Sequence, residues 1–140
     1  RMEHFKCDSR DVLLMLVKNP VGLSSCINYV SKMQGNPAIV FALNDNAADG
    51  RDVSWIWDSS FYPLSDFDEF YTVGKRSLDM AVRLKYDGIR CAALNGECYG
   101  KLTDIIKSSD KNFVIMSTYT SMMNMRPDFV SNFGGREFWK

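Results

Sequence analysis

The chain has 140 residues, of which 46% are hydrophobic and 24% are charged, and its formal net charge at pH 7 is zero. A chain of this length and composition is typical of one globular domain with a sizeable hydrophobic core. The balanced charge gives no electrostatic basis for binding nucleic acid, and no apolar run approaches the roughly 18 residues of a transmembrane segment. We therefore expect neither nucleic acid as a partner nor a membrane span.

The predicted elements begin with strands. Residues 3–7 are expected to form a short strand that enters the domain. Two later stretches in the first half of the chain, residues 11–17 and 38–43, are apolar runs that predict buried strands. Between the last two, residues 23–34 carry apolar side chains at helical spacing, with Ser24 or Ser25 available as the N-terminal cap.

The second half continues the alternation. Strands are predicted at residues 70–73, 89–94 and 112–117, and helices at 74–87, 98–108 and 120–130. Pro127 is expected to interrupt the last helix, because proline removes a helical hydrogen bond. The pair Gly134-Gly135 indicates a loose tail.

Strands that alternate with helices at this spacing predict an α/β fold: a Rossmann-like, mostly parallel sheet of about five or six strands with helices on both faces. We assign residues 1–140 to a single domain. The chain starts Arg1-Met2-Glu3 with no initiator methionine, so we expect it to be a fragment of a longer protein.

Four cysteines are scattered through the sequence, at positions 7, 26, 91 and 98, and no two form a Cys-x-x-Cys pair. This spacing argues against a zinc site or a disulfide scaffold, and reduced thiols in the cytoplasm are the simplest interpretation. A catalytic cysteine also needs a histidine partner, and the chain offers only His4. We therefore expect no metal site and no Cys-His catalytic pair.

The most informative stretch is residues 44–58, which directly follows a predicted buried strand. It holds four Asp, one Arg and two of the three Trp in the chain, so its formal charge is −3. In open α/β sheets, ligands bind at the carboxyl ends of strands, where this stretch is expected to lie. A plain loop rich in turn-forming residues is the simpler alternative. A calcium loop fits poorly, because Ala47 and Ile56 occupy two of the required ligand positions.

Three shorter runs are further candidate sites. The run Gly74-Lys75-Arg76-Ser77 lacks the earlier glycine of a phosphate loop, which would stand at Glu69, so its cations are predicted to be surface residues of a first helical turn. Asn19 lies in a strand-to-helix turn that could also line a cleft beside the acidic loop. The run Tyr119-Thr120-Ser121 could cap the last helix.

Residues 43–58 closely resemble the signature of the C-terminal domain of the MurT family, the Mur-ligase-like subunit of lipid II isoglutaminyl synthase. Residues 16–22, 80–86 and 119–122 agree with the same family, so the resemblance spans nearly the whole chain. The first residues resemble the end of the segment that leads out of the central, ATP-binding domain. The resemblance implies that this central domain is absent from the chain.

The family resemblance implies an ATP-dependent carbon–nitrogen ligase, using Mg²⁺, that activates the stem-peptide glutamate of lipid II at the cytoplasmic side of the membrane. A GatD-like glutaminase supplies ammonia from glutamine, using a Cys and a His, and the product is isoglutamine. By motif position, the Asp that completes the glutaminase triad is Asp52. From residue type alone, Asp45, Asp49 and Asp58 remain alternatives. The isolated chain is expected to be inactive and to need no cofactor.

The resemblance also implies roles for neighbouring residues. The nucleotide and substrate cleft is expected to include five residues: Asn19, Asn44, Asp45, Asp49 and Arg51. Asp58 is expected at the contact with the partner, and Trp55 and Trp57 either contact that partner or hold the loop in place. Two other functions stay open, namely a domain of a different Mur-type amide ligase and a non-catalytic module that only docks a partner.

Overall fold

The computed structural model describes residues 2–138, so Arg1, part of the predicted link to a preceding domain, lies outside the described residues. The strands are β1 (Met2–Cys7), β2 (Arg10–Leu16), β3 (Ala38–Ala42), β4 (Phe70–Val73), β5 (Ala92–Ala93), β6 (Phe113–Ser117) and β7 (Gly134–Phe138). The α-helices are α1 (Pro20–Ser31), α2 (Ser77–Tyr86), α3 (Tyr99–Ser108) and α4 (Tyr119–Asn132). Three short 3₁₀ helices, η1 (Ala47–Asp49), η2 (Ser54–Asp58) and η3 (Tyr62–Leu64), connect β3 to β4.

The seven strands form one sheet in the order β5-β4-β3-β6-β2-β1-β7. Strands β2 to β6 pair in parallel, and β1 pairs antiparallel with both β2 and β7. The predicted α/β class with a mostly parallel sheet is therefore confirmed. The sheet has one strand more than the upper expected number.

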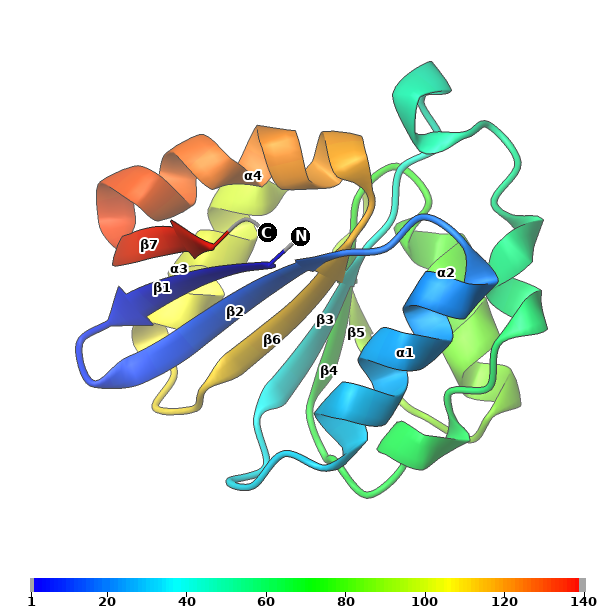
Figure 1. The fold of residues 1–140 in the computed structure, drawn as a ribbon, viewed down its shortest axis with the longest axis horizontal. Helices are drawn as coiled ribbons and strands as arrows, with labels where there is room; N and C mark the ends of the chain where they lie inside the picture. Colours follow the sequence, from blue (N-terminus) through cyan, green and yellow to red (C-terminus); the bar gives the residue numbers. More distant parts are fainter. Residues whose placement is uncertain (1, 139–140) are drawn as a thin grey trace.

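Helices cover both faces of the sheet, with α1 and α2 on one side and α3 and α4 on the other (Figure 1). The alternation of side chains along β3 shows why both layers form. Val40 packs among the residues of α3 and α4, whereas its neighbour Phe41 packs among those of α1 and α2. Both side chains are buried, as expected for a central parallel strand.

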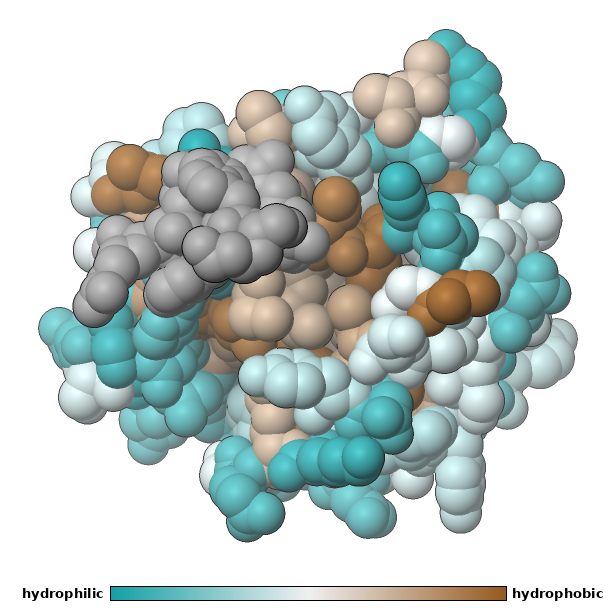
Figure 2. Space-filling view, viewed as in Figure 1, coloured by the Kyte–Doolittle hydropathy of each residue, from teal (hydrophilic) through white to brown (hydrophobic). Residues whose placement is uncertain are grey.

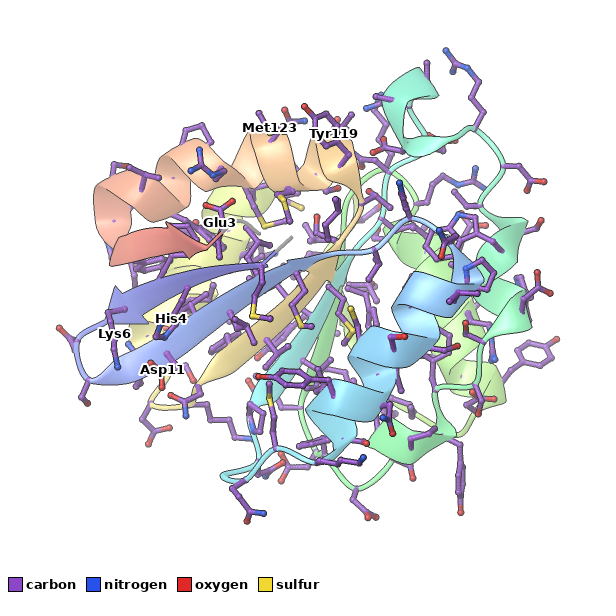
Figure 3. The ribbon with its side chains drawn as sticks, viewed as in Figure 1. Glu3, His4, Lys6, Asp11, Tyr119 and Met123 are labelled. Carbon is purple, nitrogen blue, oxygen red and sulfur yellow. The ribbon has the colours of Figure 1, made fainter. Side chains whose placement is uncertain are left out.

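Part of the sheet beside α1 remains open. Figure 2 shows apolar side chains there, over the middle of the molecule, and a groove of about 510 Å³ is lined by Met2, Leu13 and Met33 among others. Along this surface, the Nε2 atom of His4 and the Nζ atom of Lys6 each lie 2.7 Å from Asp11 Oδ1 (Figure 3). These contacts lower the pKa of Asp11.

Two helices differ from their predicted bounds. Helix α1 begins at Pro20 rather than residue 23, and its N-terminal cap is Asn19 rather than Ser24 or Ser25. Proline at the first helical position has no N–H to satisfy, so the earlier start costs nothing. Helix α4 continues through Pro127. Its buried residues Met125 and Phe129 hold it against the sheet on either side of the proline.

Two strand predictions also need correction. The strand expected at 89–94 is reduced to β5 (Ala92–Ala93), because only these two residues pair with β4. The expected loose tail at Gly134-Gly135 is instead the start of β7, which pairs with β1 through backbone hydrogen bonds. Such pairing needs no apolar side chains, so it leaves little trace in the sequence.

The segments that follow the neighbouring strands β3 and β6 leave the sheet toward opposite faces. The segment after β3 turns to the α1 and α2 face, where Val53 and Ile56 are buried, while α4 follows β6 on the opposite face. Open α/β sheets bind ligands at such a point of divergence. None of the helices in the described part of the chain is long and apolar enough to cross a membrane.

Candidate functional site at the carboxyl edge of the sheet

Asn44 is the residue at which the loops after β3, β4 and β6 meet. Its side chain is fully buried. Its backbone N–H donates to Thr118 Oγ1 at 3.0 Å, and its Nδ2 donates to Thr120 Oγ1 at 3.0 Å. Its Oδ1 accepts the backbone N–H of Lys75 at 2.8 Å. One amide therefore joins three loops, and its predicted role of facing a ligand remains a prediction.

The loop after β4 can lie close to the end of β3 because residue 74 is a glycine. Its φ is +104°, and a Cβ at this position would lie 2.5 Å from the carbonyl oxygen of Leu43 and 2.9 Å from Asn44 Oδ1. A side chain is therefore excluded both by the backbone conformation and by the space. Only glycine allows the loop after β4 to lie directly against the end of β3.

Asp49 closes the acidic loop onto α4. Its Oδ1 accepts the backbone N–H of Thr120 at 2.7 Å, and its Oδ2 accepts the hydroxyl of the same residue. Oδ2 also accepts the backbone N–H of Asn46 at 3.1 Å. The carboxylate thus satisfies a free N–H in the first turn of α4 from a distant part of the chain, which a local sequence pattern cannot reveal.

Charged residues link the acidic loop to the start of α2. Arg76 Nη1 lies 2.9 Å from Asp45 Oδ2, and Arg76 Nε lies 2.7 Å from Asp79 Oδ2. The Arg76 guanidinium lowers the pKa of Asp79. Beside it, Lys75 Nζ donates to Asn46 Oδ1 at 2.7 Å. The two cations predicted to be plain surface residues therefore hold the first part of the loop.

Glu97 joins the network from the loop before α3. Its Oε1 accepts hydrogen bonds from Asn44 Nδ2 at 3.2 Å and from Asn124 Nδ2 at 3.1 Å. The neighbouring hydroxyl of Tyr99 bonds Ser121 Oγ at 2.8 Å, and burial raises the pKa of this tyrosine to about 12. Tyr99 therefore stays neutral under all ordinary conditions.

Asp52 lies apart from this network, in the turn between η1 and η2. Its carboxylate is exposed and accepts the backbone N–H of Ser54 at 2.9 Å. This hydrogen bond lowers the pKa of Asp52, so the group is ionised at neutral pH. In the described part of the chain, no hydrogen bond or ion pair joins it to Asn44, Asp45 or Asp49. The neighbouring Arg51 is also exposed.

The aromatic residues of η2 differ in exposure. Trp55 is half-buried and packs against the core beneath α1 and α2. Trp57 is 47% exposed and meets Tyr86 of α2 edge to face, with 5.1 Å between ring centroids. Asp58 is exposed next to it. Trp55 thus anchors the loop, whereas Trp57 and Asp58 are accessible to a partner.

Asn19 lies after β2 at the same edge of the sheet. Its Oδ1 accepts the backbone N–H of Gly22 at 2.8 Å, which makes it the cap of α1. The structure therefore joins Asn44 and Asp49 through Thr120, and Asp45 lies beside them in an ion pair with Arg76. Asn19 and Asp52 have separate local partners.

Several residues of the network had no clear signal in the sequence. Thr120 belongs to a run that predicts a helix cap and agrees with the family, whereas neither Glu97 nor Asn46 carries a prediction of its own. Their contacts depend on loops that are far apart in the chain, such as the 71 positions between Asp49 and Thr120. Across residues 2–138, no group of three His, Cys, Asp or Glu side chains is placed to hold a metal ion.

Comparison with known proteins identifies the family of the chain. Residues 16–122 match the family described as MurT ligase C-terminal. The chain is 32% identical over 139 residues to a Staphylococcus aureus protein named lipid II isoglutaminyl synthase (glutamine-hydrolyzing) subunit MurT, covering 96% of this chain and 31% of that protein. A Streptococcus pneumoniae protein of the same name is 32% identical over 132 residues, covering 90% and 29% respectively. The chain therefore spans about a third of these relatives, and it belongs to the MurT ligase C-terminal family.

Proposed function

We propose that this chain is the C-terminal domain of a ligase subunit that amidates the stem-peptide glutamate of lipid II to isoglutamine. In this proposal the nitrogen comes from glutamine, through a GatD-like glutaminase bound to the ligase, and the reaction takes place at the cytoplasmic side of the membrane. The chain alone is inactive, because both the phosphate-binding domain and the glutaminase lie outside it. The relatives named above carry this lipid II isoglutaminyl synthase activity in their names.

Within that reaction, the chain supplies Asp52 to the glutaminase. The observation that supports this role is an exposed, ionised carboxylate in a turn whose two ends are fixed to the domain. A carboxylate bonded to a catalytic histidine fixes the histidine tautomer and stabilises the imidazolium that forms during turnover. Asp45 and Asp49 are engaged with Arg76 and Thr120, so they are less available to a partner.

The surface around Asp52 suits contact with another protein. Trp57 and Asp58 are exposed on the next turn, and tryptophan is enriched among the residues that dominate binding energy at interfaces. Trp55 supports the same turn from below. We propose that Trp57 and Asp58 contact the glutaminase, while Arg51 faces the nucleotide and substrate cleft.

ATP and Mg²⁺ belong to the full-length enzyme in this proposal. The groups at the carboxyl edge do not form a site for them by themselves, because Asp45 and Asp49 are already paired and no three metal-binding side chains come together among residues 2–138. Phosphate binding is therefore assigned to the central domain. Asn19, Asn44, Asp45 and Asp49 are proposed to shape one wall of the closed cleft.

The proposal is tested by comparing two nitrogen sources in the full-length ligase with its glutaminase. Asp52→Asn should abolish amidation driven by glutamine and leave amidation driven by ammonium salts intact, since ammonia bypasses the triad. Asp66→Asn, which changes an exposed carboxylate outside the acidic loop, is the matched control and should retain both activities.

The alternatives give different results in the same assay. A docking-only role predicts that Asp52→Asn weakens the complex but leaves glutamine-driven turnover normal once the partner is saturating. A Mur-type ligase that joins an amino acid instead of ammonia would respond to neither nitrogen source and would not bind a glutaminase.

A further inference from the structure

Arg83 is a charged residue of α2 that is buried, with 6% of its surface exposed. Its Nε donates to the backbone carbonyl of Ile56 at 3.0 Å, and its Nη2 donates to the carbonyl of Ser59. Both carbonyls belong to η2 or to the residue directly after it. A short 3₁₀ helix leaves such carbonyls without internal partners, so the guanidinium satisfies the end of the segment that follows Asp52.

The same guanidinium is fixed from its other sides. Arg83 Nη1 lies 3.1 Å from Asp87 Oδ1, and Asp87 Oδ2 accepts the backbone N–H of Phe61 at 2.7 Å. The Arg83 Cζ atom also lies 5.0 Å from the ring centroids of both Trp57 and Phe61. These contacts offset the cost of burying the charge and fix the backbone from Ile56 to Phe61.

The turn that carries Asp52 is therefore held at both ends. On one side, Asp49 is bonded to Thr120 at the start of α4. On the other side, η2 is bonded to Arg83 of α2. Only residues 50–55 lie between Asp49 and Ile56, and Val53 among them is buried. Because this span is short, the bonds at its two ends determine where the exposed carboxylate of Asp52 points.

We infer that Arg83 is a positioning residue for Asp52, acting through the backbone of η2 on the glutaminase reaction of the partner. This inference rests on the proposed function. Arg83 is buried beneath η2, so it does not touch the glutamine substrate. Its planar fork reaches two carbonyls and one carboxylate at once, which a lysine ammonium in the same place cannot do.

The test uses the full-length ligase in complex with its glutaminase and the substitution Arg83→Lys. Because a displacement of about 1 Å in a catalytic group can cost on the order of 10²-fold, glutamine-driven amidation should fall by roughly 10- to 100-fold in kcat. The KM for glutamine and the ammonium-driven rate should stay unchanged. Arg90→Lys, an exposed arginine just after α2, is the matched control and should have no effect.

A double-mutant cycle separates positioning from a general structural role. If Arg83 acts through Asp52, adding Arg83→Lys to Asp52→Asn should cause no further loss of glutamine hydrolysis. An equal loss in both backgrounds, a loss of ammonium-driven activity, or failure of the complex to form would each overturn the inference. If Asp52→Asn itself leaves glutamine hydrolysis intact, the proposed function fails; if it abolishes hydrolysis while Arg83→Lys has no effect, only the role of Arg83 fails.

Discussion

Asp49 accepts the backbone N–H of Thr120, 71 residues later in the chain, at 2.7 Å and so caps helix α4. The hydroxyl of Thr120 completes the arrangement, because it donates to Asp49 and accepts from both Asn44 and Asn46. One carboxylate and one hydroxyl thereby join the loop after β3 to the helix after β6. This bond fixes the near end of the turn that presents Asp52.

Replacing Asp49 with alanine should lower the stability of the domain. The change removes a cap and leaves N–H groups of Asn46 and Thr120 without an acceptor, so we expect a loss of about 1–2 kcal/mol in the free energy of unfolding. Urea unfolding measures this loss. Asp58→Ala is the control, since Asp58 is exposed, and equal effects of the two variants would contradict the assigned role of Asp49.

Asn44→Asp should be more damaging than its similar shape suggests. The new oxygen would face Glu97 Oε1, at a position now 3.2 Å from the donor Nδ2, and would bring a buried charge beside a carboxylate. We expect a loss of about 1–3 kcal/mol. The exposed Asn95 provides the control, and Asn95→Asp should unfold at nearly the wild-type urea concentration.

Gly74→Ala tests the close packing of two loops. The added Cβ would meet the Leu43 carbonyl at 2.5 Å in a backbone conformation that favours glycine, so we expect a loss of about 1–3 kcal/mol. Gly100, in the first turn of α3, has no atom within 4 Å of an added Cβ. Gly100→Ala should therefore be neutral or stabilising, and a thermal melt that ranks the two variants in the opposite order would contradict this packing.

The Arg76–Asp79 pair should give a pH-dependent contribution to stability. Arg76 holds the pKa of Asp79 below its ordinary value of 3.8, so the pair stabilises the folded state above that pH and the effect disappears as pH falls through the lowered pKa. Because Asp79 is partly exposed, Asp79→Asn should cost only about 0.5 kcal/mol at pH 7. Urea unfolding at pH 7 and near pH 2.5 should show the two proteins converging at the lower pH; a constant difference would be inconsistent with this pair.

The sequence contained enough information for the central part of the fold. Buried strands such as β3 and β6 are short apolar runs bounded by turn residues, which is a local signal. The strand β7 and the unbroken α4 were missed for a physical reason. Backbone pairing with β1 forms β7, and core packing of Met125 and Phe129 carries α4 past Pro127, and neither depends on local propensity.

At the site, too, local sequence signals identify some residues, whereas contacts with distant segments determine the role of others. Residues 44–58 stood out by composition and by family resemblance, so Asn44, Asp45 and Asp49 could be chosen from the sequence. Glu97 and Arg83 could not, because an acidic residue before a helix and an arginine inside one are ordinary on their own. Their importance comes from carbonyls and amides that distant segments bring to them.

The most direct test of the account is the rate of glutamate release from glutamine by the full-length ligase with its glutaminase. Wild type and Asp52→Asn are compared, with complex formation verified for both. The account predicts a loss on the order of 10⁴-fold for Asp52→Asn in an intact complex, the scale seen when the aspartate of a serine protease triad is changed to asparagine. Unchanged glutamate release would contradict it and would move the role to Asp45, Asp49 or Asp58.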